Sequence, residues 1–202
     1  MAIKSLLKPI LKLSTMLVIT SVVLANTASA QWSLNNDASL LSFVTVKAEH
    51  IAEVHTFEAL SGNIDNSGNI EINIELASVN TLISVRDERM QSMLFETDLF
   101  PKAVITGRVD IDALSDLSTG ASQRSEVEFE LSLHGASVSL TADLMINRTQ
   151  AGLVASTMKP IIVKADSLGL LAGIERLREA AGLPGISRSV SVSFTVMFEQ
   201  SN

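Results

Sequence analysis

The chain has 202 residues, with 22 acidic and 15 basic side chains and no cysteine. Without cysteine, the protein has no disulfide, no thiolate metal ligand and no thiol nucleophile, so its fold must depend on its core. The formal net charge of −7 is poorly suited to binding nucleic acid or an anionic membrane surface, because both carry negative charge.

The first 30 residues have the three-part pattern of a secretory signal peptide. Three lysines precede an apolar run over 13–25, and Ala-Ser-Ala at 28–30 fits a cleavage site. The apolar run is short for a membrane span, and no cysteine follows it to carry a lipid anchor; an uncleaved anchor helix is the alternative. We therefore expect 1–30 to be a cleaved signal peptide, with export to the periplasm and no stable membrane insertion afterwards. The mature domain, 31–202, has a net charge of −10.

Apolar and polar residues alternate along much of the mature chain, which is typical of half-buried antiparallel strands. The clear runs are 69–76, 126–133, 137–146 and 189–198, and the weaker ones are 40–47, 54–60, 103–112 and 153–164. About eight such strands predict an all-β fold, an extended antiparallel barrel. At this strand number, a closed barrel can hold one small ligand.

Turn-forming residues separate several of these runs. Asp65–Asn69 predicts a hairpin loop, and His134–Ser137 predicts a tight turn. The longer stretch Ala113–Arg124 is expected to be a mobile hairpin tip.

Two segments replace alternation with helical spacing, and so two short amphipathic helices are predicted. Arg86–Thr97 has methionine and leucine at helical intervals, and Pro101 follows it. In 166–185, an apolar stripe runs from Leu170 to Ala181, and charged residues point away from it. We expect these helices to cover the open mouths of the barrel.

Catalytic and metal-binding motifs are absent from the sequence. The three histidines do not have the spacing of a zinc site. The glutamates of 126–130 alternate with core residues and are expected on a solvated strand face, as are Asp110 and Asp112. No serine hydrolase, phosphate-loop or dinucleotide glycine motif occurs. We therefore expect no metal, no catalytic residue and no enzyme activity.

One cluster, Arg86-Asp87-Glu88-Arg89, has four charged residues in a row, and the sequence allows two roles for its arginines. Arg86 and Arg89 are three residues apart, so they share a face of a helix. They either form ion pairs with neighbouring strands or make a cationic rim for an acidic or phosphorylated head group, because a guanidinium group matches such groups well.

Several short motifs, taken in order, resemble the YceI-like family. They are SVNT at 78–81, RDERM at 86–90, Leu94-Phe95 with Pro101, and LSLHG at 131–135. The resemblance covers essentially all of 31–202. It implies a lipocalin-like barrel in a secreted or periplasmic protein, and some members hold a long polyisoprenoid or similar lipid in an apolar tunnel. The sequence departs from the common pattern at DASLLSF (37–43) and VHTF (54–57).

These observations lead to the hypothesis of an exported, non-enzymatic carrier of an isoprenoid or fatty-acyl lipid. The sequence allows a homodimer and predicts no nucleic-acid partner and no cofactor besides a bound lipid. The candidate lipid-lining residues are Phe43, Phe57, Ile72, Ile74, Leu76, Met90, Phe95, Phe129, Leu131, Val192 and Phe194. The head-group candidates are Arg86, Arg89 and His134. The alternatives are a structural or interaction barrel with a filled core and, third, an enzyme that acts on the lipid.

Overall fold

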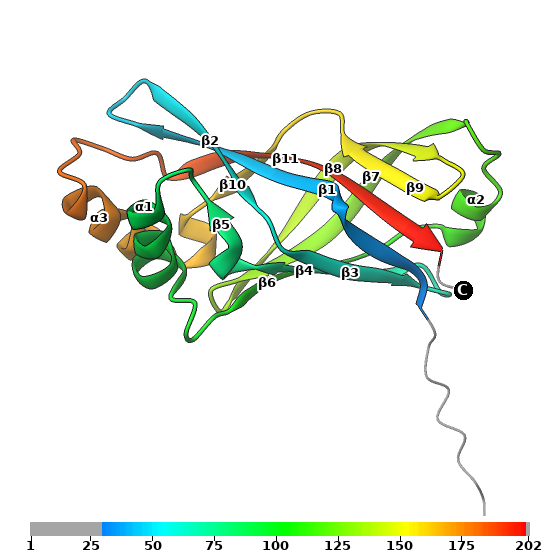
Figure 1. Ribbon diagram of the computed structural model, residues 1–202, viewed down its shortest axis with the longest axis horizontal. Coiled ribbons are helices and arrows are strands. Elements are labelled where there is room, and N and C mark those ends of the chain that lie inside the picture. The colour runs from blue at the N-terminus through cyan, green and yellow to red at the C-terminus, as the bar shows by residue number, and fades with distance from the viewer. Residues whose placement is uncertain (1–29, 201–202) are drawn as a thin grey trace, which may run out of the picture.

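The computed structural model describes residues 30–200, which fold into a closed antiparallel barrel with helices at both ends (Figure 1). The predicted signal peptide lies outside the described residues except for Ala30. Eight strands close the wall, in the order β1 (Ala30–Lys47), β3 (Leu60–Asp65), β4 (Asn69–Glu75), β6 (Lys102–Arg108), β7 (Ser122–Leu133), β8 (Ala136–Arg148), β9 (Gly152–Thr157) and β11 (Ser189–Gln200). β11 then pairs with β1. The prediction of an all-β, lipocalin-like barrel of about eight strands is confirmed.

Three short strands extend the wall at one end of the barrel. β2 (Ile51–Phe57) pairs with the second half of β1, and β5 (Val79–Asn80) pairs with β2. β10 (Ile161–Lys164) pairs with β11. The long strand β1 runs along both halves of the barrel: its start pairs with β3 and its second half pairs with β2. Its pairing with β11 shifts between Asn35 and Leu40. Such an irregularity bends a strand and increases its local twist.

The predicted alternation places apolar side chains inside the barrel. On β7, Val127 and Leu131 are buried, whereas Glu126, Glu128 and Glu130 are exposed. The buried apolar residues form two clusters, one around Phe43 and Leu168 and the other around Trp32 and Phe198. Burial of this surface is the main favourable contribution to folding.

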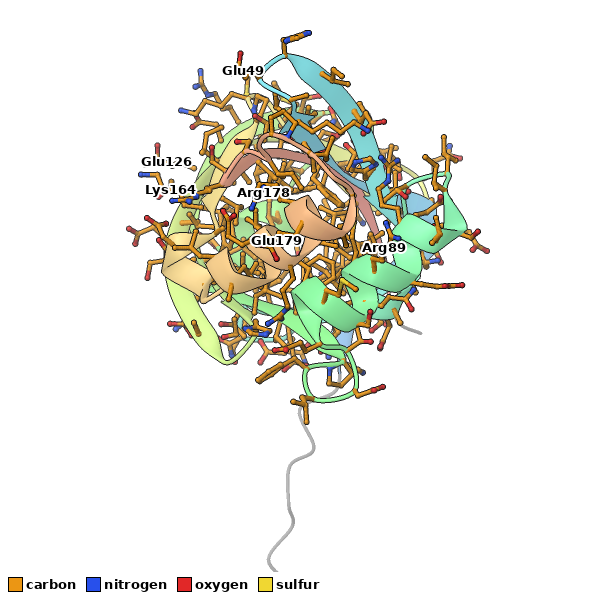
Figure 2. The ribbon with its side chains drawn as sticks, turned by 90° about the vertical axis from the view of Figure 1, so that its left-hand side faces the viewer. Glu49, Arg89, Glu126, Lys164, Arg178 and Glu179 are labelled. Atoms are coloured by element: carbon orange, nitrogen blue, oxygen red, sulfur yellow. The ribbon has the colours of Figure 1, made fainter. Side chains whose placement is uncertain are left out.

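Helices from two separate parts of the chain cover the same end of the barrel. α1 (Ser84–Arg89) continues directly into the π-helix η2 (Met90–Phe95), and α3 (Leu171–Ala180) packs against η2. Figure 2 looks onto this end and shows both helical segments across the barrel. The two short 3-10 helices are η1 (Leu76–Ser78) and η3 (Asp166–Leu168). The predicted pair of helices exists, but both members lie over one mouth.

The structure corrects three local predictions. β6 ends at Arg108, so Asp110 and Asp112 are not strand residues: Asp110 instead caps the short helix α2 (Ile111–Ser115) by accepting a hydrogen bond from the Ala113 amide, at 3.0 Å. The stretch 113–124 is therefore partly helical, and α2 lies at the end of the barrel opposite α1 and α3 (Figure 1). The run 153–164 is two strands, separated around Pro160, whose nitrogen cannot donate to a sheet.

Within residues 30–200, no helix has the length and apolar character needed to cross a membrane.

Candidate ligand-binding site

The barrel holds a cavity of about 300 Å³ beneath the helices α1, η2 and α3. Apolar side chains make up most of its lining. They come from the strands and, on the helical side, from η2, which contributes Met90 and Phe95, and from α3, which contributes Ile174 and Leu177. A row of aromatic rings crosses this region. Phe43 stacks on Phe57 with a centroid distance of 5.3 Å, and Phe57 lies 5.8 Å from Phe95.

A second cavity, of about 100 Å³, lies in the other half of the barrel, and only apolar side chains and a glycine line it. The two cavities share five lining side chains, which we call the waist: Leu41, Ile74, Ile105, Phe129 and Phe194. Because the same five side chains line both cavities, the cavities are adjacent, and together they place apolar space in both halves of the barrel. An extended chain is the ligand shape that matches this space.

All eleven residues predicted to line a lipid site are lining residues of one cavity or of both. Ile72 lines the second cavity, and Ile74, Phe129 and Phe194 belong to the waist. The remaining seven line the first cavity, namely Phe43, Phe57, Leu76, Met90, Phe95, Leu131 and Val192.

Polar side chains line the first cavity at one end only, where β1, β2, α1 and the segment before β11 meet. Glu53 of β2 lies at the centre of this group. Its Oε2 is 2.7 Å from Lys47 Nζ and 2.8 Å from Arg86 Nη1. The hydrogen bond from Lys47, helped by the charge of Arg86, lowers the pKa of Glu53. Glu53 is therefore an anion at neutral pH and neutralises part of the positive charge around it.

His55 is the most buried member of this polar group, with 3% of its surface exposed. Its Nε2 lies 2.9 Å from Thr45 Oγ1, and its ring meets Phe43 edge-on. Burial, followed by the nearby charge of Arg86, lowers the pKa of His55, so its ring is neutral at neutral pH. His55 Nδ1 and Arg86 Nε are buried and have no hydrogen-bond partner among the described residues.

The structure separates the three predicted head-group residues. Arg86 and Arg89 both line the first cavity, and Arg86 also donates to the Thr81 carbonyl at 2.6 Å. His134 is not among the residues that line either cavity. Its Nε2 is 2.7 Å from Glu96 Oε2, and its ring packs against Phe100. It therefore anchors the end of η2 to the turn between β7 and β8.

The charged cluster 86–89 combines features of both interpretations. Asp87 fixes the start of α1 by accepting a hydrogen bond from the Thr81 amide at 2.9 Å. Arg86 bridges helix and strand through Glu53, while its side chain, like that of Arg89, also contacts the cavity. The cluster therefore holds the helix in place and presents cations to the interior.

Sequence reasoning missed Lys47, Glu53 and His55. Their signal was the parity of two strands: Thr45 and Lys47 share a face with the inward-pointing Phe43, and Glu53 and His55 share a face with Phe57. The register places Phe43 opposite His55, which brings the two polar groups together. Among residues 30–200, no group of three or more histidine or acidic side chains is arranged to hold a metal ion.

Gly173 allows the two helical segments over the cavity to pack closely. A Cβ at this position would lie 2.8 Å from the Met93 carbonyl oxygen and 2.9 Å from Leu94 Cα. We expect Gly173→Val to push α3 away from η2, to lower the unfolding free energy by about 1–3 kcal/mol, and to speed ligand release. Chemical denaturation and a ligand-release assay measure both effects.

Ala172→Val is the matched control, because Ala172 is exposed on the same helix. It should cost only about 0.5 kcal/mol, from the lower helix propensity of valine. Equal losses in the two variants would show that the close contact between α3 and η2 is not important.

A closed antiparallel barrel around an elongated apolar interior defines a lipocalin-like protein. A family model for the YceI-like domain matches residues 32–198. The chain belongs to the YceI-like family.

Solved structures show the same fold. A domain from Saccharophagus degradans, described as polyisoprenoid-binding and implicated in plant cell wall breakdown, is 37% identical, with a TM-score of 0.84, over 86% of this chain and all of that one. Burkholderia cenocepacia BcnA is 13% identical, with a TM-score of 0.62, over 81% of this chain and 98% of its own. A mutant CJ YCEI protein with a monobromobimane guest is 16% identical, with a TM-score of 0.52, over 73% and 85%. None of the curated proteins matches the chain.

Proposed function

We propose that this protein is a periplasmic, non-enzymatic carrier that sequesters or transports a polyisoprenoid or another long-chain lipid. The observation that carries the proposal is the pair of adjacent cavities with an apolar lining and polar side chains at one end. A lipid with a long chain and a small polar head is likewise apolar along most of its length and polar at one end. The similar Saccharophagus degradans domain, described as polyisoprenoid-binding, supports the same class of ligand.

Burial of the chain provides the binding energy in this proposal. Each methylene removed from water contributes about 0.8 kcal/mol, so a long chain binds without covalent chemistry. The N-terminal pattern of lysines, apolar run and Ala-Ser-Ala at 28–30 supports export. A carrier in the periplasm would shield such a chain from water between two membranes.

Native mass spectrometry of the protein purified from its own periplasm tests this function. We expect a bound mass that leaves on denaturing extraction as a prenyl chain or a fatty-acyl lipid, and a mature N-terminus at Gln31. An empty protein that also fails to take up added prenols would contradict the carrier function and favour a structural barrel.

A further inference from the structure

The polar end of the first cavity carries an excess of positive charge. Four cations, Lys47, Arg86, Arg89 and Arg188, line this cavity, and Glu53 is the one carboxylate among its lining residues. This local excess stands out because residues 31–202 together have a net charge of −10. Because the charged side chains and the few neutral polar ones lie together at one end of a mostly apolar lining, the charges are concentrated where a chain would end.

The carboxylates near these cations do not neutralise all of them. Lys47 and Arg86 share the single carboxylate of Glu53. Arg188 pairs with Glu175 at 3.3 Å. Arg89 forms no ion pair within residues 30–200 and donates to the Ala180 carbonyl oxygen at 3.2 Å. Figure 2 shows Arg89 between α1 and α3, at the covered end of the barrel.

We propose that Lys47, Arg86 and Arg89 bind an anionic head group, a carboxylate or a phosphate. In the protein without ligand, the carboxylate of Glu53 occupies the position of this head group. This inference rests on the proposed lipid-carrier function. The guanidinium groups of Arg86 and Arg89 suit the paired oxygens of such a head group. The carboxylate of Glu53 already shows that an anion is held between Lys47 and Arg86.

The unpaired polar atoms at this site favour a ligand there. His55 Nδ1 and Arg86 Nε are buried without partners among the described residues, and each such atom costs about 1–3 kcal/mol. Oxygens of an anionic head group would accept a hydrogen bond from Arg86 Nε and, in the tautomer with its proton on Nδ1, from His55. A neutral head could do the same, but it would leave the excess positive charge uncompensated, so the charge selects an anion.

Matched ligands that differ only in the head group test this selection. Native mass spectrometry should show geranylgeranyl phosphate binding at least tenfold more tightly than geranylgeraniol, or palmitic acid more tightly than hexadecanol. The pair with the larger ratio identifies the phosphate or the carboxylate as the natural head. High salt should reduce the advantage of the anion, because the site is partly exposed.

The sharpest variant is Glu53→Gln, for which we expect a gain of affinity. It removes the carboxylate that competes for Lys47 and Arg86, so anionic ligands should bind about tenfold more tightly, with no gain for the alcohols. A damaged protein would lose affinity for both ligands, so a selective gain cannot come from misfolding. Arg89→Met should weaken binding of the anion about tenfold and spare the alcohol.

Arg108→Met is the control for loss of one positive charge, because Arg108 is exposed on β6 and does not line either cavity. Equal binding of anionic and neutral ligands, with no effect of Glu53→Gln, would overturn the anionic-head proposal and leave the carrier function intact. Failure of every ligand to bind the wild-type protein would overturn the carrier function, and the head-group site with it.

Discussion

Replacing Ala155 with phenylalanine is expected to abolish tight binding of long chains while short chains still bind. Ala155 lies on β9 and lines the second cavity, where it packs among Ile146, Val196 and their neighbours. A phenyl ring at this position would fill much of a space of about 100 Å³. A chain that passes the waist would then have to withdraw its far end.

The expected loss follows from the number of methylenes that can no longer be buried. Five methylenes at about 0.8 kcal/mol each amount to about 4 kcal/mol, or roughly a thousandfold in dissociation constant. Affinities for farnesol, geranylgeraniol and solanesol should therefore rise with chain length in the wild-type protein and level off in the variant.

Ala151→Phe provides the control, because Ala151 is exposed in the turn before β9. This substitution adds the same volume as Ala155→Phe, but outside the cavity. Unchanged binding of solanesol by Ala155→Phe would show that the chain stops at the waist. A parallel loss for all three prenols would indicate damage to the barrel instead.

The parity of the strands made most of the cavity wall predictable. Ile72 and Ile74 on β4, and Phe129 and Leu131 on β7, occur at every second position, and this period assigns one face of each strand to the interior. The same rule placed the glutamates of 126–130 outside. Whether the inward side chains fill the interior was not predictable, because a cavity depends on barrel shape and packing rather than on composition.

Only part of the polar site could be predicted from the sequence. Arg86 and Arg89 stood out because they are close together in the chain. Lys47, Glu53 and His55 belong to two strands whose register decides which side chains meet, and that register appears only in the fold. Helix α2 was missed for a different reason: five residues are too few to show helical periodicity.

His134 shows that a short motif does not by itself identify a binding residue. It has a positive φ of 53°, in the turn that joins β7 to β8, and its side chain bonds to Glu96 rather than facing the cavity. Glu96 also accepts a hydrogen bond from Arg176 of α3, at 3.1 Å. The LSLHG motif therefore supports the helices that cover the cavity, so its role in the site is indirect.

Gly152→Val is expected to cause the largest loss of stability. Gly152 begins β9 opposite Glu199 of β11, and a Cβ there would lie 1.9 Å from the Phe198 carbonyl oxygen and 2.9 Å from its carbon. Backbone atoms cannot rotate away as a side chain can, so β9 would have to separate from β11. The hydrogen bond from the Gly152 amide to Thr149 Oγ1, at 3.0 Å, would be disturbed as well.

We expect a loss of about 3–5 kcal/mol in the unfolding free energy, which is a large part of the 5–15 kcal/mol typical of a domain. Urea denaturation followed by circular dichroism measures it. Gly185→Val is the matched control, because a Cβ at Gly185 has no heavy atom within 4 Å. Equal midpoints for the two variants would show that β9 can move without loss of stability.

Leu153 and Ala155 of β9 line the second cavity, so separation of this strand in Gly152→Val would also expose the end of the lipid site. Gly152→Val should therefore weaken the binding of long chains more than the binding of short chains.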